Sequence, residues 1–225
     1  MTQHRLRSHC SWLEPLFALC VAAAIVRAAI YFYLNEHFPQ PFFYEPYDIW
    51  MDWFNVSYWS YEPGAYDSWG TIYPPFSFVF LRVFSWAPCY RETSGYLVRE
   101  CDKLGIVTLH GFFLLNVVLL WLTFRKWHRP SSLWRTFALG LGLPSLYGLE
   151  RGNLVVVTFT FIILGLGPLI KSARWRWLMV GMAVNLKVYV LAAIFPQLLR
   201  RRWLWFEGAI LSCILVYAVS FMIYG

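Results

Sequence analysis

Apolar residues are gathered along this chain into long runs separated by short polar segments. A helix that crosses a membrane needs about 20 predominantly apolar residues. Runs that reach or approach this length occupy residues 12–34, 104–124, 154–170, 177–199 and 204–224. The pattern therefore predicts an all-α integral membrane protein, built as a multi-span helical bundle.

Two shorter apolar pieces lie between these runs. Residues 72–87 begin near two prolines and contain Arg82, so we expect them to lie along the membrane surface rather than to cross it. Residues 136–149 form the second piece, which we expect to rise to the polar segment Glu150-Arg151-Gly152-Asn153.

Positive charge is concentrated in the polar segments that precede or separate the apolar runs. Twelve of the nineteen Lys and Arg residues fall in four short blocks, at residues 5–7, 125–135, 171–176 and 200–202. Cytoplasmic loops of membrane proteins carry such an excess of positive charge. The net charge of +7 raises nucleic acid as a partner, but the blocks leave no contiguous basic face, and we expect no nucleic-acid partner.

Residues 177–199 have basic blocks on both flanks, so a simple span would place one block on the wrong side. We therefore predict a helical hairpin that enters and leaves on the cytoplasmic side and turns near Asn185-Leu186-Lys187. Broken helices at membrane depth are tolerated where they line a protein cavity.

The region 35–103 has the opposite character. Residues 28–81 contain no Lys or Arg and hold six of the twelve acidic residues. Fourteen Phe, Trp and Tyr residues lie between Phe38 and Tyr73. We predict that residues 35–103 form one long external loop region that carries interfacial helices, with residues 1–225 as a single transmembrane domain.

The five cysteines show no spacing typical of a metal site. Cys89 and Cys101 flank one short polar loop and would be able to pair if that loop lies outside the cytoplasm. We favour the interpretation that both are unpaired packing residues.

Ionisable residues in or beside a membrane core are candidates for function. Lys187, Arg151 and Arg82 qualify here. Each also has a plain structural interpretation. The long side chain of Lys187 would be able to reach water from within the membrane, and Arg151 would be able to neutralise Glu150. Arg82 would be able to anchor the chain at the membrane interface, and for Arg82 we favour this interpretation.

The chemistry of these groups favours a lipid phosphate and a sugar as substrates. Arg and Lys bind phosphate through charge-assisted hydrogen bonds. A carboxylate such as Asp52 or Asp48 is able to act as a general base. Aromatic rings stack on the apolar faces of sugars, which gives the rings of residues 38–73 a function beside the usual aromatic belt of the membrane interface.

The order of these motifs resembles a known family. Asp48 and Asp52 follow the first helix, then come Tyr73-Pro74-Pro75, Glu150-Arg151-Gly152-Asn153 and Lys187. This order is similar to that of GT-C fold transferases that use polyprenyl-phosphate sugars. It is most like that of the bacterial enzymes grouped with the mycobacterial α-mannosyltransferases in glycosyltransferase family 87.

The resemblance implies roles for individual residues. Asp52 matches the loop aspartate of the family best, with Asp48 as the alternative, and the two would share one face if this piece is helical. Arg151, Lys187 and Arg82 would bind the donor phosphate. The substrate-binding candidates are Tyr73, Trp53, Trp59, Asn153 and Glu150. Members of the family are usually much longer, so we expect this chain to be the N-terminal part of a GT-C module.

We therefore predict a transferase that moves a mannose-like hexose from a polyprenyl-phosphate donor to a glycan or glycolipid acceptor. It would work on the outer face of the cytoplasmic membrane, with its N-terminus in the cytoplasm, and would use no cofactor. Glu45, Asp48 and Asp52 would hold a divalent ion if one takes part, but solvated charge is the simpler interpretation and we predict no metal site. The alternatives are a transporter or flippase for a lipid-linked or anionic substrate, and a non-catalytic scaffold.

Overall fold

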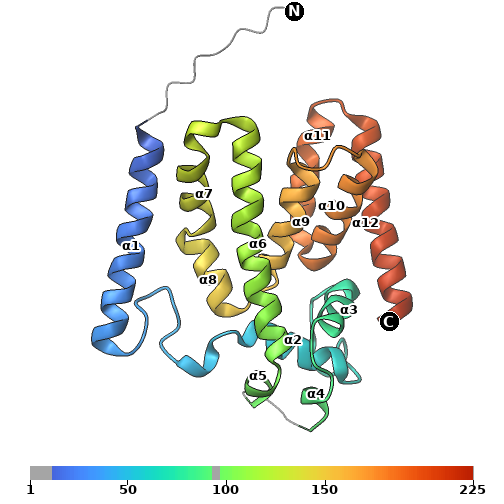
Figure 1. Cartoon of the computed structure of the whole chain (residues 1–225). Coiled ribbons are helices and arrows are strands. Elements are labelled where there is room, and N and C mark those ends of the chain that lie inside the picture. Colours follow the sequence, from blue (N-terminus) through green and yellow to red (C-terminus); the bar gives the residue numbers. More distant parts are fainter. Residues whose placement is uncertain (1–11, 93–96, 225) are drawn as a thin grey trace, which may run out of the picture.

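The computed structural model describes residues 12–92 and 97–224, and every regular element in these residues is a helix (Figure 1). Three helices are long and apolar enough to cross a membrane. These are α1 (Leu13–Asn35), α6 (Lys103–Trp127) and α12 (Trp203–Tyr224). The predicted class, a helical membrane protein, is therefore supported.

Shorter helices complete the bundle between α6 and α12. They are η2 (Arg129–Ser131), α7 (Ser132–Gly140), α8 (Leu143–Arg151), α9 (Val155–Leu166) and α10 (Ala173–Leu186). The apolar piece 136–149 is not one helix, because the chain breaks between α7 and α8 and restarts with Pro144 in the first turn of α8. Proline fits that position, since the first turn of a helix needs no donor from its own backbone.

The predicted hairpin over residues 177–199 is present. Helix α10 ends at Leu186, Lys187 is extended, and the chain returns through η3 (Val188–Ile194) and α11 (Phe195–Leu199). Helix α12 packs against α10. Both ends of the hairpin lie at the end of the bundle where α1 begins (Figure 1).

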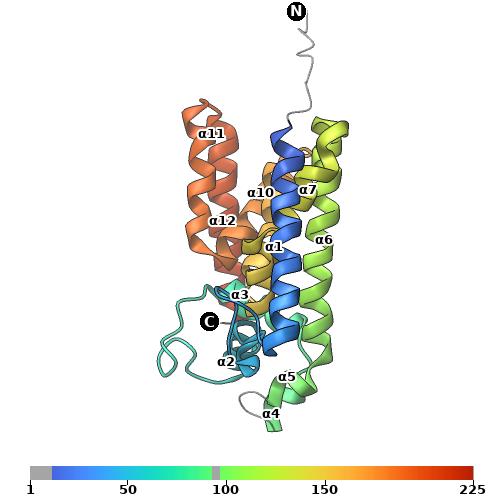
Figure 2. The ribbon, with the colours of Figure 1, turned by 90° about the vertical axis from the view of Figure 1, so that its left-hand side faces the viewer.

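The remaining helices gather at the opposite end of the bundle (Figures 1 and 2). They are η1 (Pro46–Asp48), α2 (Met51–Tyr61), α3 (Pro75–Val83), α4 (Cys89–Glu92) and α5 (Leu97–Cys101). Helix α3 covers only about 14 Å at 1.5 Å per residue, which is too short to span and agrees with the surface position expected for residues 72–87. It packs against α2 and α12.

Charge separates between the two ends of the bundle. The loops that follow α6, α9 and α11, with their basic blocks, lie at the end where α1 begins. Residues 36–92 and 97–102 lie at the other end (Figure 1). At the end where α1 begins, Arg135 of α7 pairs with Glu14 of α1 through two hydrogen bonds. Arg5 and Arg7, which the sequence also assigns to this end, lie outside the described residues.

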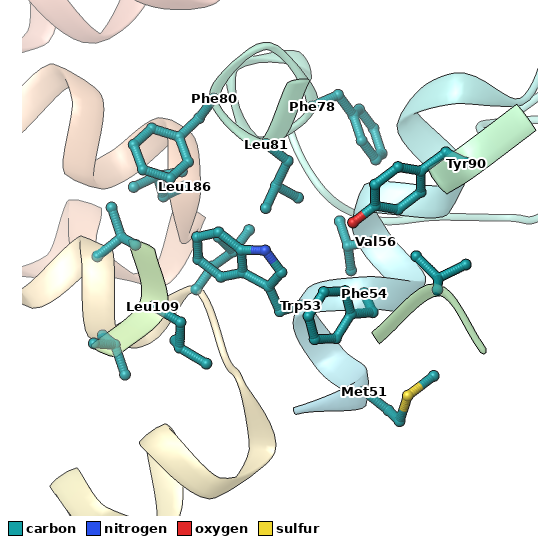
Figure 3. Packing of buried hydrophobic residues seen from close by; sticks show 14 of the residues in the cluster. Met51, Trp53, Phe54, Val56, Phe78, Phe80, Leu81, Tyr90, Leu109 and Leu186 are labelled. Atoms are coloured by element: carbon teal, nitrogen blue, oxygen red, sulfur yellow. The ribbon is translucent and has the colours of Figure 1, made fainter. Parts of the chain in front are cut away.

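One core cluster joins α2 and α3 to the helices of the bundle. Figure 3 shows Trp53 and Phe54 of α2 packed among residues of the neighbouring helices. Their partners include Leu81 of α3, Leu109 of α6 and Leu186 at the end of α10. Trp53 is 0% exposed, so its ring packs in the core and is not a surface on which a sugar can stack.

Cys89 and Cys101 form a disulfide, so the interpretation that both are unpaired was wrong. The bond joins α4 to α5 beside Asp102, which is fully buried. Asp102 accepts hydrogen bonds from Gly105 N at 2.9 Å and from the Tyr90 hydroxyl at 2.7 Å. It thereby caps α6 and ties α4 to it. Burial, together with this contact, raises the pKa of Tyr90 far above its usual value.

Candidate active site

The segment Glu150-Arg151-Gly152-Asn153 forms the turn between α8 and α9, and its shape depends on Gly152. Gly152 ends α8 in the left-handed region, at φ +67°. A Cβ at this position would lie 2.6 Å from the carbonyl oxygen of Trp50, so only glycine fits the close approach. Trp50 N also donates to Glu150 O at 2.7 Å. These contacts bring the start of α2 against the end of α8.

Asp52 lies in the first turn of α2 and is bound by this turn. Arg151 makes a two-pronged ion pair with it, from Nε to Oδ2 at 2.9 Å and from Nη2 to Oδ1 at 3.0 Å. Asn153 Nδ2 donates to Oδ2 at 2.8 Å, and Asn153 Oδ1 accepts from Val155 N at the start of α9. The pair is accessible, with side-chain exposures of 35% for Arg151 and 23% for Asp52.

Two aromatic residues fix the guanidinium of Arg151. Its Nη1 donates to the Tyr147 hydroxyl at 3.1 Å, and its Cζ lies 5.0 Å from the ring centroid of Phe43. Neither residue was among the candidates predicted from the sequence. Tyr147 lies four residues before Arg151, a spacing that places two side chains on one helix face and was visible in the sequence. Phe43 carries no comparable signal.

Glu150 does not neutralise Arg151. Its Oε1 accepts from Phe43 N at 2.9 Å, while Oε2 is buried and has no partner within the described residues. Glu150 also lines an apolar cavity of about 360 Å³ between α1, the loop before α2, and α8. It anchors the loop before α2 against α8 and borders the site.

Lys187 reaches the same area from the turn of the hairpin. Its Nζ donates to the Tyr73 hydroxyl at 3.2 Å and lies 4.5 Å from the centroid of that ring. Burial, and next the charge of Asp52, raise the pKa of Tyr73 to about 12, so this hydroxyl keeps its proton at neutral pH. Asp52 and Arg151 both act electrostatically on Lys187. The structure thus brings Asp52, Arg151, Asn153, Tyr73 and Lys187 together.

Other predicted residues lie elsewhere. Asp48 belongs to η1 and is separated from α2 by Trp50, which is left-handed, so Asp48 and Asp52 do not share a helix face. Arg82 donates from Nε to Ser60 O at the far end of α2. Trp59 is partly buried and stacks near Trp69, with ring centroids 6.4 Å apart.

The described residues contain no group of three or more His, Cys, Asp or Glu side chains that could hold a metal ion. Glu45, Asp48 and Asp52, which the sequence offered for a divalent ion, do not gather. Asp52 instead faces the cation of Arg151.

The family model of glycosyltransferase family 87 matches residues 71–225, which is more than half of the chain. The chain belongs to glycosyltransferase family 87. No curated protein and no solved structure matches it. The resemblance of the sequence to this family is thus confirmed, whereas the GT-C type of the fold stays a prediction.

Membership of glycosyltransferase family 87 indicates a glycosyltransferase, which uses a sugar donor and an acceptor. The matched residues include Tyr73, Arg151, Asn153 and Lys187. Asp52 precedes the match, and its contacts with Arg151 and Asn153 join it to the matched part of the chain.

Proposed function

We propose that this family 87 glycosyltransferase moves a hexose, mannose-like in kind, from a polyprenyl-phosphate donor to a hydroxyl of a glycan or glycolipid acceptor. The reaction takes place on the outer face of the cytoplasmic membrane. The observation that carries this proposal is the pairing of Asp52 with Arg151, beside Lys187. It sets one carboxylate against two cations at the edge of the helical bundle.

Asp52 is the general base. Its Oδ1 accepts one hydrogen bond from Arg151, and a carboxylate oxygen has room for a second. The acceptor hydroxyl occupies that place and gives its proton to Asp52 as its oxygen attacks the anomeric carbon. The bond from that carbon to the phosphate oxygen breaks, the electron pair stays on polyprenyl phosphate, and the single displacement inverts the anomeric configuration.

Arg151 and Lys187 stabilise the leaving phosphate. Nζ of Lys187 has three N–H groups, and Tyr73 is its one hydrogen-bond partner among the described side chains. Cations placed in advance stabilise the charge that develops on the departing phosphate. They stabilise it more strongly than they stabilise the charge of the bound donor. Tyr73 stays neutral and orients Lys187 toward the phosphate.

The lipid part of the donor fits the cavity beside Glu150. Apolar side chains of α1, of the loop before α2 and of α8 line most of its about 360 Å³, including Ile25, Leu146 and Leu149. A polyprenyl chain is apolar and gains free energy when such a cavity removes it from water. Its phosphate would then leave the cavity next to Arg151, the neighbour of Glu150.

The outer-face location is supported by charge and by redox chemistry. The basic loops lie at the end of the bundle opposite to the site, as expected for the cytoplasmic side. The disulfide between Cys89 and Cys101 lies at the site end, and disulfides persist in oxidising compartments outside the cytoplasm.

The test supplies a panel of polyprenyl-phosphate sugars to membranes that contain the full chain, and measures hexose transfer to glycan or glycolipid acceptors. We expect transfer with the native protein and a loss of at least about 100-fold with Asp52→Asn, the lower range for loss of a general base. Asp48→Asn is the matched control and should retain activity. Equal losses in both variants, or none in either, would refute the assignment of the base.

A transporter of the same lipid also fits a cation at a broken helix. It should tolerate Asp52→Asn and should move donor across the membrane without forming product. Movement of intact donor that Asp52→Asn does not change, with no glycosylated acceptor, would favour transport over transfer.

A further inference from the structure

A pocket lined by charged and aromatic side chains lies at the other end of α2, away from Asp52. Its volume is about 400 Å³, and its lining includes Tyr61, Glu62, Tyr66, Asp67, Arg82 and Tyr224. We propose that this pocket binds a neutral hexose unit of an oligosaccharide acceptor, at a position remote from the hydroxyl that reacts. The inference rests on the proposed function for its meaning, but binding itself is testable without transfer.

Arg82 supplies fixed hydrogen-bond donors to the pocket. Its Nε donates to Ser60 O at 2.7 Å, and its Cζ lies 5.5 Å from the ring centroid of Tyr61 and 4.9 Å from that of Tyr224. Within the described residues, neither terminal nitrogen has a hydrogen-bond partner. A guanidinium held in this way pays little conformational entropy when it binds a ligand, because its plane is already set.

Glu62 and Asp67 supply acceptors to the same pocket. The side chain of Asp67 is exposed and makes no hydrogen bond or ion pair within the described part of the chain. Glu62 lies near the Tyr58 hydroxyl and keeps acceptor positions free. Two carboxylates would repel a phosphate, whereas the hydroxyls of a neutral sugar both donate to carboxylates and accept from a guanidinium. The mixture of groups therefore favours a neutral sugar.

The distance between the pocket and Asp52 indicates the size of the acceptor. Tyr61 follows Asp52 by nine residues in α2, which amounts to roughly 14 Å along the helix axis. One hexose cannot touch both places. The Tyr66 hydroxyl donates to Tyr73 O at 3.1 Å, so one wall of the pocket continues toward Tyr73 and the site. An acceptor of several sugars would be able to follow this wall.

The experiment measures binding of an α-linked mannotetraose and of methyl α-mannoside to the full chain in lipid nanodiscs by titration calorimetry, without donor. We expect the tetraose to bind, and both Arg82→Met and Asp67→Asn to weaken its binding about tenfold, the scale of one charge-assisted hydrogen bond. Arg91→Met is the control, since Arg91 is exposed on α4 and lies outside the pocket. It should leave the affinity unchanged.

Asp67→Asn is the variant least able to disturb folding, because this exposed side chain makes no hydrogen bond or ion pair within the described residues. Equal affinities for tetraose in the native protein and in both pocket variants, or no tetraose binding by the native protein, would overturn the proposal. Tetraose binding that depends on Arg82 and Asp67, in a protein that transfers no hexose, would support the pocket and reject the proposed function.

Discussion

Asp52 lies in the first turn of α2, where the partial positive charge of the helix N-terminus adds to that of Arg151. Both attract the carboxylate oxygens. In the proposed reaction Arg151 also binds the donor phosphate. Binding of that phosphate would then compete with Asp52 for the guanidinium and release the carboxylate for the acceptor, so the pair would couple donor binding to activation of the base.

Arg151→Lys tests the two-pronged geometry. A lysine keeps the charge but cannot donate two parallel hydrogen bonds to one carboxylate. Losing one charge-assisted hydrogen bond of about 1.5–3 kcal/mol predicts a fall in kcat/KM of about 10- to 150-fold. Steady-state kinetics of hexose transfer measures this change. Lys126→Arg, a change at the opposite end of the bundle, should have no effect, and wild-type activity of Arg151→Lys would contradict the model of the pair.

Tyr73→Phe tests the contact with Lys187. We expect a loss of roughly tenfold in transfer rate, the scale of one hydrogen bond to a charged group. Because burial raises the pKa of Tyr73 to about 12, this hydroxyl does not titrate between about pH 6 and pH 10. The pH profile of kcat/KM in that range should therefore keep its shape and fall by a constant factor. A basic limb that disappears in Tyr73→Phe would contradict this role.

Some residues of the site could be predicted from the sequence, and others could not. The resemblance to the family selected Asp52, Arg151, Asn153 and Lys187, through the order of the short motifs that contain them. It favoured Asp52 over Asp48, but the residues alone could not separate the two, since the choice depends on where α2 begins, and the left-handed Trp50 sets that. The sequence also gave no sign that the ring of Trp53 faces the core, because nearly every residue around it is apolar or aromatic.

At the scale of elements, the site depends on the contact between the end of α8 and the start of α2. Gly152→Ala should break it, because the new Cβ would meet the backbone of Trp50. The left-handed backbone alone costs about 1–2 kcal/mol for alanine. The clash adds to this cost and moves Arg151 away from Asp52. We expect a lower melting temperature and a loss of most transfer activity.

Gly70→Ala is the matched control for this change. Gly70 is also left-handed, at φ +58°, but a Cβ there meets nothing within 4 Å. It should carry the backbone cost without the clash, and should keep its activity. Thermal unfolding in nanodiscs and transfer assays compare the two variants. Equal losses of activity would show that the close approach to Trp50 does not matter.

The elements were predictable to different degrees. The turn of the hairpin at Lys187 followed from two basic blocks that had to lie on one side. The break between α7 and α8 was not foreseen, although Gly140, Gly142 and Pro144 mark it, because apolar residues continue through it. Helices α2 to α5 were expected only as interfacial helices, since amphipathic periodicity is weak where almost every residue is apolar or aromatic.

The whole molecule is organised by charge. Basic loops occupy one end of the bundle. The acidic, aromatic-rich residues 36–92 and 97–102 occupy the other, together with the site. This separation could be predicted because the cost of moving positive loops across a membrane leaves few arrangements of the helices. The contacts that the residues before α6 make with the turns after α8 and α10 could not be predicted, because they depend on side chains brought together from distant parts of the chain.

The orientation of the molecule can be tested by labelling single cysteines with a membrane-impermeant maleimide, in a background with Cys10, Cys20 and Cys213 replaced by serine. Tyr44 is 73% exposed in the loop between α1 and α2, and Ser172 is exposed between α9 and α10. We expect Tyr44→Cys to react in intact spheroplasts and Ser172→Cys only after permeabilisation. The parent with the three replacements gives the background signal, including any from the Cys89–Cys101 disulfide. The reverse pattern would place Asp52 on the cytoplasmic side, where a donor facing outward could not reach it, and would refute the proposed location of the reaction.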